Sequence, residues 1–344
     1  MSPLPLIFPS PPGSELVSGG NIYNRELAAE LLHLRPVEVI DADAWERALA
    51  ADAPGLHLVD TLLMERFLAA ALAPRPDRRA LLLVHHLPSL EPDIAPDDPG
   101  LAVEAAALER FDGFVTTSPY TSAYLRERGV PAAAIVTVPP GLPDIPRPAL
   151  SCPARVRMLM AGNLIARKAV LPLLQALAAA LTPRDDLRLD IVGRADLDPA
   201  YAHACERLIA SEPALQRTAR VHGPVTYQEM DAHYQSTTAF VSASRMETYG
   251  MALAEARAYG VPILACDGGN SRNHFTDGVD GHLYRDPQAL AAGVLALARA
   301  PDDAAALFAR AQATRPAITY TWSEAARTLD RGLAELVWAA SAGE

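Results

Sequence analysis

The segment METYGMALAEARAYG, Met246 to Gly260, says more about the fold of this chain than any other. An apolar, β-branched run at 237–244 comes before it, a helical pattern follows Gly250, and the strand-like VPILAC comes directly after it. We therefore predict a strand, a turn that carries Glu247, and a helix that carries Glu255. Unpaired N–H groups at the start of such a helix favour a diphosphate, and the two carboxylates can accept hydrogen bonds from sugar and ribose hydroxyls.

The composition is that of a globular protein with room for two domains. The chain has 344 residues, of which 50% are hydrophobic and 21% are charged. It contains no apolar run of about 18 residues, and its first residues, MSPLPLIFPSPPGSE, lack the charged start and apolar core of a signal peptide. We therefore expect a cytoplasmic protein without an integral membrane segment, while peripheral membrane contact stays open.

Charge and cysteine usage argue against further classes. The formal net charge of −11 argues against a nucleic-acid partner and gives no support to binding of an anionic membrane. Cys152, Cys205 and Cys266 are odd in number and far apart, so they indicate neither a disulfide framework nor a CxxC metal site. We expect buried or reduced thiols.

Strand-like and helix-like segments alternate through the chain, as in doubly wound α/β units. The expected strands lie at 4–8, 36–40, 56–60, 80–86, 113–118 and 134–139, and after an interruption at 155–163, 187–195, 220–224, 238–244, 261–266 and 281–285. The interruption is the proline-rich segment Pro139 to Pro153, and proline clusters resist continuation of either element. We predict domains at 1–145 and 154–320, a linker near 140–153, and a C-terminal helix within 321–344.

A series of motifs follows in a fixed order along the chain: SGGNIYNRELAAEL, LLLVHH, FVTTSPYTSAYL, VPPGLP, MLMAGNLIARKAVLPLLQAL, LDIVGRA, ARVHGPVTYQEMDAHYQ, METYGMALAEARAYGVPILACDGGN and DGVDGHLY. This series resembles that of the retaining nucleotide-sugar glycosyltransferases of family 4, which have the GT-B fold. The resemblance covers about residues 13–330 and is most specific over 156–285. It implies an α/β architecture in which two Rossmann-like, doubly wound domains face a central cleft. The first domain would hold the acceptor and the second the nucleotide-sugar donor, and the final helix would cross back to the first domain.

The resemblance also implies a reaction. A hexose-like sugar would move from a nucleoside diphosphate to an acceptor hydroxyl, with retention at the anomeric carbon. The expected donor is a UDP- or GDP-linked sugar, and no cofactor is expected. Related GT-B enzymes generally need no divalent metal, and no DxD-type acidic pair stands in an expected phosphate loop. Loops of the first domain, such as SLEPDIAPDDPGLAVE from Ser89 to Glu104, would contact the acceptor, whose identity no motif indicates.

Two cations are the expected phosphate contacts of the second domain. In AGNLIARKAV, Arg167 and Lys168 follow a buried strand and precede a helix, so both can reach a diphosphate through charge-assisted hydrogen bonds. Lys168 matches the lysine of the family, whereas the family's earlier basic position is Asn163 in this chain. Arg167 then either substitutes for that cation or caps the turn. Ala169 stands where the family usually has glycine.

The glutamates and the turn between them complete the expected donor site. The family pattern assigns Glu255 to the nucleotide ribose and Glu247 to hydroxyls of the donor sugar. Tyr249, Gly250 and Met251 would offer backbone amides to the diphosphate, and Gly250 permits its close approach. The alternative for the glutamates is a pair of surface charges early in a helix, where negative charge is stabilising by about 0.3–1 kcal/mol.

The first half of the chain offers a glycine pair and a histidine. Gly19 and Gly20 precede the helical segment NIYNRELAAEL, and we expect a Gly-Gly turn whose amides approach the donor, with Asn21 as a helix cap. His85 ends an apolar strand, at the sheet edge where α/β proteins bind ligands. The resemblance places His85 near the donor sugar and the acceptor, where it would bind a sugar hydroxyl or orient the acceptor. His86 is the weaker candidate.

Two other classes remain open. A degenerate GT-B binding protein or a nucleotide-sugar epimerase fits the departures at Asn163, Ala169 and Asn273, the last of which stands where the family often has glutamate. A nicotinamide-dependent dehydrogenase would need GxGxxG after a strand and an acidic residue about 20 positions further on, which the sequence lacks. His222, in RVHGP, would lie near the donor base without a catalytic role.

Overall fold

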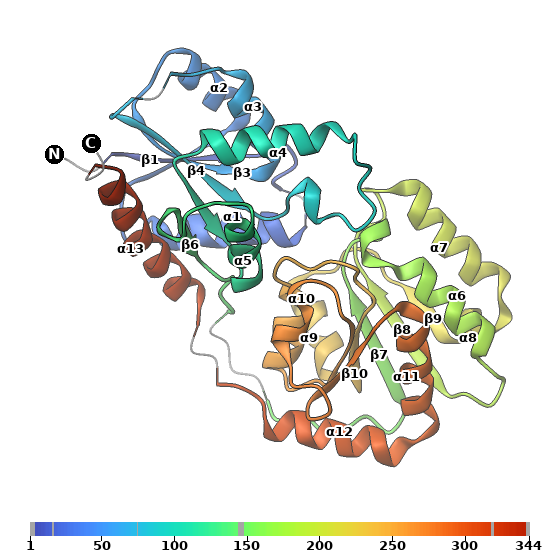
Figure 1. Cartoon of the computed structure of the whole chain (residues 1–344). Helices are drawn as coiled ribbons and strands as arrows, with labels where there is room; N and C mark the ends of the chain where they lie inside the picture. The colour runs from blue at the N-terminus through green and yellow to red at the C-terminus, as the bar shows by residue number, and fades with distance from the viewer. Residues whose placement is uncertain (1–3, 16, 74, 144–147, 318–319, 342–344) are drawn as a thin grey trace. The chain divides into compact units, whose positions relative to one another are not determined.

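The computed structural model describes residues 4–15, 17–73, 75–143, 148–317 and 320–341. The chain divides into two compact units: unit 1 consists of Met1–Pro143 with Thr319–Glu344, and unit 2 is Asp144–Ile318. In Figure 1, unit 1 runs from blue to green and includes the red C-terminal helix, and unit 2 runs from light green to orange. Each unit is built on one six-stranded sheet.

The sheet of unit 1 has the order β2-β1-β3-β4-β5-β6, and all neighbours are parallel. Its strands are β1 Leu6–Ser10, β2 Val37–Asp41, β3 Gly55–Asp60, β4 Arg78–Val84, β5 Gly113–Thr116 and β6 Ile135–Thr137. Its helices are α1 Gly19–Leu31, α2 Ala42–Ala50, α3 Met64–Ala69, α4 Pro99–Arg110, α5 Pro119–Glu127 and α13 Trp322–Ser341, with short 3-10 helices η1 Thr61–Leu63, η2 Pro88–Leu90 and η3 Ala132–Ala134. The strand order reverses between β1 and β3, which are neighbours in the second and third places of the sheet.

Helix α13 follows unit 2 in the sequence but packs in unit 1, against α1 and β6 (Figure 1). Trp322 is 7% exposed and meets Tyr23 of α1 edge to face, with ring centroids 5.7 Å apart. Gly332 lies so close to β6 that an added Cβ would stand 2.5 Å from Cγ1 of Val136. The end of the chain therefore supplies part of the core of unit 1.

The sheet of unit 2 has the order β12-β11-β10-β7-β8-β9, again with parallel neighbours. Its strands are β7 Val156–Ala161, β8 Leu187–Val192, β9 Ala219–Val221, β10 Ala239–Ser242, β11 Ile263–Cys266 and β12 Gly281–Tyr284. Its helices are α6 Val170–Ala180, α7 Pro199–Ser211, α8 Pro213–Thr218, α9 Tyr227–Gln235, α10 Met251–Ala258, α11 Pro287–Arg299 and α12 Pro301–Ala313, with 3-10 helices η4 Ala166–Lys168 and η5 Asn270–His274. Here the strand order reverses between β7 and β10.

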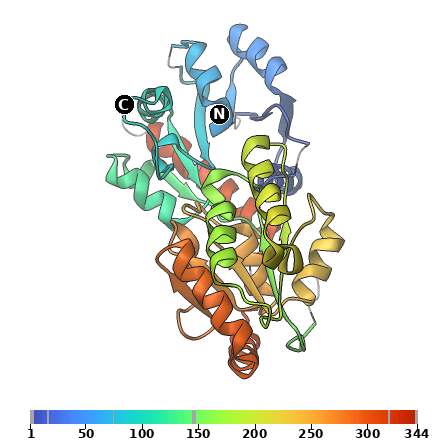
Figure 2. The same cartoon turned by 90° about the vertical axis from the view of Figure 1, so that its right-hand side faces the viewer.

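Alternate residues of the unit 2 strands point to opposite faces of the sheet and form an apolar layer on each face. Met158 and Val241 belong to the layer shared with α6, α7 and α11, whereas Leu159 and Phe240 belong to the layer shared with α9 and α10. Figure 2 shows α6 (light green) and α7 (yellow-green) in front of the sheet. Burial of the sheet on both faces explains why β11 is apolar throughout and why β7 and β10 each contain only one polar residue.

The predicted α/β class is confirmed by the two parallel sheets, and every expected strand overlaps an observed one. The start of α1 was predicted wrongly. Gly19 and Gly20 are the first residues of this helix, because the Ser18 side chain caps it by accepting from the Asn21 N–H at 3.1 Å. The Asn21 side chain is not the cap and donates instead to the Gly13 carbonyl at 2.9 Å.

The expected acceptor loop 89–104 is also shorter than predicted. Its last part is the beginning of α4, which starts at Pro99 after the N-cap Asp98. Proline is well suited to the first helical position, because its missing N–H would be unpaired there in any case. The irregular part of this segment therefore ends before Pro99.

No helix of the described ranges is long and apolar enough to cross a bilayer, and no group of three or more His, Cys, Asp or Glu side chains within them is placed to hold a metal ion. The three cysteines are free, and Cys205 and Cys266 are buried, as the sequence predicts. The cytoplasmic location stays a prediction.

Candidate functional site

Unit 2 reverses its strand order between β7 and β10. In an open α/β sheet the connections after two such strands leave toward opposite faces, which opens a crevice at their carboxyl ends where ligands bind. Residues 162–169 follow β7, and residues 243–250 follow β10. The two cations and the first glutamate predicted from the sequence lie on these two loops.

An ion pair joins the two loops. The Lys168 ammonium donates to Oε1 of Glu247 at 2.6 Å, and Glu247 is only 8% exposed. Burial acts to raise the pKa of this carboxyl, but the charges of Lys168 and Arg167, with hydrogen bonds from Lys168 and Ser244, outweigh burial and hold the pKa below its usual value. Glu247 is therefore a buried carboxylate rather than a surface charge.

The backbone of the β7 loop brings Lys168 to this position. A Cβ added to Gly162 would lie 3.4 Å from Cε of Lys168, so the lysine stem packs directly over the glycine. Ala169 follows in the left-handed conformation, with φ +49° and ψ +34°. L-residues adopt this conformation at a cost of about 1–2 kcal/mol, which glycine avoids. The left-handed backbone at this position explains why the family usually has glycine there.

Arg167 ties the same two loops together through their backbones. Its Nη1 donates to the Met246 carbonyl at 2.7 Å, and the Arg245 N–H donates to the Arg167 carbonyl at 2.9 Å. These contacts match the turn-capping alternative of the sequence analysis. The contact of Arg167 with phosphate stays a prediction.

The turn before α10 is held from the β11 side by the 3-10 helix η5. The Tyr249 carbonyl accepts from Nδ2 of Asn270 at 2.8 Å and lies 2.6 Å from Nε2 of His274. Burial keeps the pKa of His274 below its usual value, against the opposing effects of this hydrogen bond and of Glu247, so its neutral ring donates one N–H to the carbonyl. Because the C=O and N–H of a trans peptide point in opposite directions, the Gly250 N–H is aimed away from Asn270 and His274.

Gly250 gives this turn its shape. It is the N-cap of α10 and has φ +96°, in the left-handed region. The N–H of Met251 is the first of the helix, and the helix dipole adds positive potential there. The structure thus brings the predicted amides of Tyr249, Gly250 and Met251 to the same loop as Glu247.

Glu255 lies one helical turn further along α10. The Tyr234 hydroxyl of α9 donates to its Oε2 at 2.7 Å, which orients the carboxylate. Tyr234 is almost fully buried and stacks on Tyr259, with ring centroids 5.0 Å apart. The ribose-binding role of Glu255 stays a prediction.

Asn163, which stands where the family has a basic residue, binds the backbone of a neighbouring strand end. Its Oδ1 accepts from the Arg194 N–H at 3.3 Å, which links the end of β7 to the end of β8. His222, at the end of β9, lies 2.6 Å from the buried Asp190, and its ring meets that of His233 edge to face.

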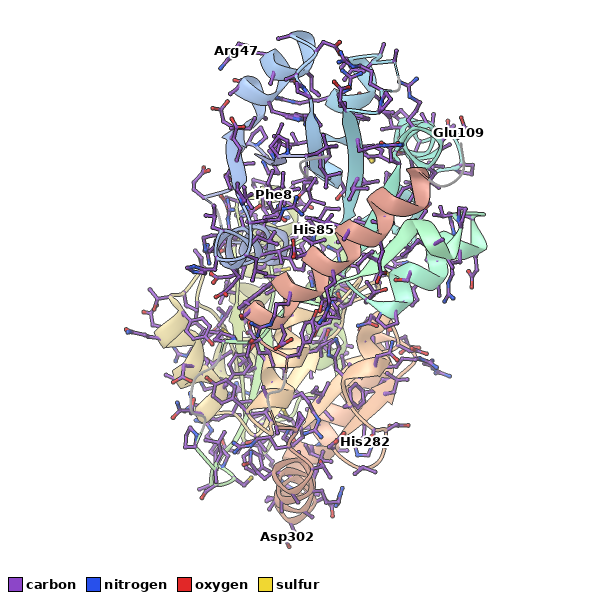
Figure 3. All side chains as sticks on the ribbon, turned by 90° about the vertical axis from the view of Figure 1, so that its left-hand side faces the viewer. Phe8, Arg47, His85, Glu109, His282 and Asp302 are labelled. Atoms are coloured by element: carbon purple, nitrogen blue, oxygen red, sulfur yellow. The ribbon has the colours of Figure 1, made fainter. Side chains whose placement is uncertain are left out.

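Unit 1 holds a second group of predicted residues at its own reversal point, between β1 and β3. His85 follows β4, and its Nε2 lies 2.7 Å from Oδ1 of Asn24 on α1 and 3.4 Å from Oδ2 of Asp60 at the end of β3. A Cβ added to Gly20 would stand 3.5 Å from Cδ2 of the His85 ring. Figure 3 labels His85. The side chain of His86 does not join this group, because its Nε2 lies 2.8 Å from Oε1 of Glu91.

Sequence reasoning found the residues of each loop but missed the side chains that hold them. Asn24 and Asp60 beside His85, and Asn270, His274 and Tyr234 around α10, were not predicted. Asn270 and His274 belong to GGNSRNH, which follows a predicted strand, so the sequence could have placed them at the ligand-binding edge of the sheet. The buried pairing of Asn24 with Asp60 had no such signal.

Two parallel α/β units, the second of which carries cations and helix amides at its strand-order reversal, are the features expected of a GT-B type of protein. Sequence models of two families match this chain: the glycosyl transferase 4-like domain over residues 9–141 and the glycosyl transferases group 1 over residues 155–300. Residues 155–300 therefore form a domain of the glycosyl transferases group 1, and residues 9–141 form a glycosyl transferase 4-like domain ahead of it.

Solved structures share the fold over nearly the whole chain. Sucrose-phosphate synthase from Thermosynechococcus elongatus superposes with a TM-score of 0.77 at 20% identity, covering 98% of this chain and 100% of that one. HepE from Anabaena, in complex with UDP-glucose, superposes with a TM-score of 0.73 at 16% identity, covering 96% of this chain and 99% of that one.

Curated relatives carry the name D-inositol 3-phosphate glycosyltransferase. That of Catenulispora acidiphila is 36% identical over 129 residues, which are 37% of this chain and 29% of the relative. The chain spans about half the length of the relatives from Thermobispora bispora and Geodermatophilus obscurus, 50% and 54% respectively.

Proposed function

We propose that this protein transfers a hexosyl group from a nucleoside-diphosphate sugar to an acceptor hydroxyl, with retention at the anomeric carbon. The observation that carries the proposal is the Lys168–Glu247 pair beside the start of α10, at the strand-order reversal of unit 2. HepE, which shares the fold, was solved with UDP-glucose, and this supports a UDP-linked donor ahead of a GDP-linked one.

The chemistry of the proposal follows from charge. As the glycosidic bond of the donor breaks, negative charge accumulates on the departing diphosphate. The Lys168 ammonium and the first amides of α10 would meet this charge, and Arg167 would add to their potential. Loss of one preorganised contact of this kind costs about 2–4 kcal/mol of transition-state stabilisation. Because these protein cations and amides can supply the neutralisation, we propose that the reaction needs no divalent metal.

The donor sugar and ribose would be held by carboxylates. Glu247 would accept from sugar hydroxyls once the diphosphate draws Lys168 away from it, and Glu255 would accept from the ribose. His85 would contact a hydroxyl of the sugar or of the acceptor. The name of the relatives makes D-inositol 3-phosphate the first acceptor to test.

The experiment has two stages. Thermal unfolding is followed with UDP, GDP and ADP, each with EDTA and with Mg²⁺, and then release of the matching nucleotide from its glucose conjugate is measured with and without D-inositol 3-phosphate. We expect stabilisation by UDP that survives EDTA, and acceptor-dependent UDP release. Nucleotide binding without release from any sugar donor would instead support a binding protein, and stabilisation only with Mg²⁺ would refute the metal-independent form of the proposal.

A further inference from the structure

Three side chains of unit 1 form a continuous hydrogen-bonded row that ends at His85. Asp60 is 1% exposed and Asn24 is 9% exposed, so both are buried behind the histidine. Nδ2 of Asn24 lies 2.6 Å from Oδ2 of Asp60, and Oδ1 of Asn24 lies 2.7 Å from Nε2 of His85. The row starts at the end of β3, crosses α1 and reaches the end of β4.

Asp60 determines how the amide of Asn24 is turned. Its Oδ1 accepts from the Leu62 N–H at 2.8 Å, and its Oδ2 faces Asn24. A carboxylate can only accept, so the Asn24 atom that faces it must be the NH2 group. The other end of the amide, the carbonyl oxygen, then faces His85.

The amide in turn determines where His85 carries its hydrogen. A carbonyl oxygen can only accept, so Nε2 of His85 must be the N–H donor, and Oδ2 of Asp60, at 3.4 Å, is a second acceptor for the same hydrogen. A neutral imidazole has a single N–H, which leaves a lone pair on Nδ1. Burial holds the pKa of His85 below its usual value, against the charge of Asp60, and this favours the neutral ring.

The remaining ring nitrogen is open to a ligand. Among the residues that the structure describes, Nδ1 of His85 has no hydrogen-bond partner, and it is not one of the buried atoms that lack one. The ring is held edge to face against Tyr23, with centroids 5.1 Å apart, and Gly20 leaves space beside it because it has no side chain. An exposed lone pair in such a place can accept a hydrogen bond from a hydroxyl.

We propose that Asp60 and Asn24 are positioning residues that hold His85 in its Nε2–H tautomer, so that Nδ1 accepts a hydrogen bond from a hydroxyl of the bound donor sugar or of the acceptor. The tautomer follows from unit 1 alone, whereas the hydroxyl contact rests on the proposed function. An imidazole in the opposite tautomer would present an N–H to the hydroxyl and could no longer accept from it.

The test reads the tautomer directly by two-bond ¹H–¹⁵N NMR of histidine-labelled protein, with the His85 signals identified by their loss in His85→Asn. The wild type should show the Nε2–H form. In Asp60→Asn the new side-chain NH2 would face Asn24 and turn its amide, so His85 should change to the Nδ1–H form. Transfer should fall by about 100-fold or more, while nucleotide stabilisation, which depends on unit 2, should stay the same.

Two further variants make the test specific. The exchange Asn24→Asp/Asp60→Asn again places a carboxylate oxygen against Nε2 and should restore both the Nε2–H form and most of the transfer rate. Asp112→Asn removes another partly buried carboxylate of unit 1, one that accepts from Arg79 and the Ala80 N–H, and should leave the tautomer and the rate unchanged.

The outcomes separate the inference from the proposed function. A wild-type Nδ1–H form, or an unchanged tautomer in Asp60→Asn, would overturn the positioning role even if transfer is observed. The inferred tautomers with a full transfer rate in Asp60→Asn would overturn the hydroxyl contact. A shift of the Nδ1 signal on adding the sugar donor alone assigns the contact to the donor, and a shift that requires the acceptor assigns it to the acceptor. Absence of transfer with the inferred tautomers would mean that the proposed function alone has failed.

Discussion

Lys168 and Glu247 neutralise each other at the end of β7, and this changes what a substitution of either residue does. Removal of one partner of a buried ion pair leaves an uncompensated charge, which typically destabilises a protein by about 3–5 kcal/mol. The sequence alone suggests that replacing Lys168 would reduce turnover far more than stability. The structure leads us to expect a loss of both.

We predict that Lys168→Met lowers kcat/KM for sugar transfer by about 100-fold and also lowers the free energy of unfolding by several kcal/mol. The double variant Lys168→Met/Glu247→Gln should recover most of the stability, because no buried charge is left unpaired, and should still be inactive. Denaturant unfolding and initial rates measure the two effects separately. Arg155→Met, which removes an exposed partner of Asp186, is the control and should change neither. Normal rates in Lys168→Met would rule out its role at the diphosphate.

The buried histidine His57 makes the stability of the protein depend on pH. His57 of β3 is fully buried, and its Nδ1 accepts from the indole N–H of Trp45 at 3.1 Å. Burial, with the charge of Arg78, lowers its pKa from 6.5 to about 4. The unfolded chain therefore takes up a proton at His57 before the folded one does, and the free energy of unfolding must fall as pH drops from 6.5 to 4.

We expect His57 to remove roughly 3 kcal/mol of stability over this pH range, at about 1.4 kcal/mol per pKa unit. Denaturant unfolding at several pH values measures the slope. His57→Asn keeps an acceptor for Trp45 but cannot take up the proton, so its slope should be smaller than that of the wild type. His203→Asn, at an exposed histidine, should keep the wild-type slope. Equal slopes for the wild type and His57→Asn would contradict the assignment.

The positions of single residues in the fold could be predicted from the sequence only where local pattern was enough. Lys168 and Glu247 were identified by their positions after two strands. Their contact was not, because they are 79 residues apart and meet only through the strand order. The same holds for Asn24, Asp60 and His85, which come from one helix and two strand ends.

At the scale of elements, the start of α10 is a turn held from both sides. Arg167 fixes the carbonyl of Met246, and Asn270 and His274 fix that of Tyr249. Gly250 is the position at which this turn enters the helix. A side chain there would be strained by φ +96° and would place its Cβ 2.9 Å from Cδ1 of Leu253 and 3.2 Å from Nε2 of His274.

We predict that Gly250→Ala weakens nucleotide binding at least tenfold, because the displaced turn no longer aims its amides, and that it destabilises the protein by about 1–2 kcal/mol. Isothermal titration with UDP and denaturant unfolding measure the two effects. Gly278→Ala is the matched control: it has φ +77° but nothing within 4 Å of the added Cβ, so only the backbone cost applies. Unchanged UDP affinity in Gly250→Ala would mean that the turn does not bind the nucleotide.

Helix α10 and helix α1 show what the sequence can tell about elements. Helix α10 was predicted correctly, because the end of β10, the glycine at position 250 and the helical periodicity after it all indicate a helix that starts there. The start of α1 was predicted wrongly because two rules competed. Gly-Gly favours a turn, but Ser18, just before the pair, caps the helix with its side chain. The Asn21 side chain cannot serve as the cap because it donates to the Gly13 carbonyl.

At the scale of the whole molecule, the two units should respond differently to ligand and to mutation. The proposed donor site lies in unit 2, whereas α13 belongs to unit 1. Trp322 packs at the start of α13 against Tyr23. Replacement of a buried tryptophan by alanine costs about 3–5 kcal/mol.

We predict that Trp322→Ala lowers the calorimetric unfolding temperature of unit 1 while UDP still stabilises unit 2. Differential scanning calorimetry with and without UDP distinguishes the two transitions. Arg327→Ala, on the same helix at an exposed ion pair with Glu324, is the control and should change stability by no more than about 0.5 kcal/mol. A single transition that Trp322→Ala and UDP shift together would contradict independent units.

The return of α13 to unit 1 also determines the order in which the protein can be completed on the ribosome. Domains generally fold as units while the chain emerges, N-terminal first. Here the residues of unit 1 up to Pro143 are made first but cannot finish their core, because Trp322 and the rest of α13 come after all of unit 2. Unit 2 can mature earlier, and until α13 has been made, the apolar surface of Tyr23 and Val136 that this helix covers faces water, where a chaperone can bind it.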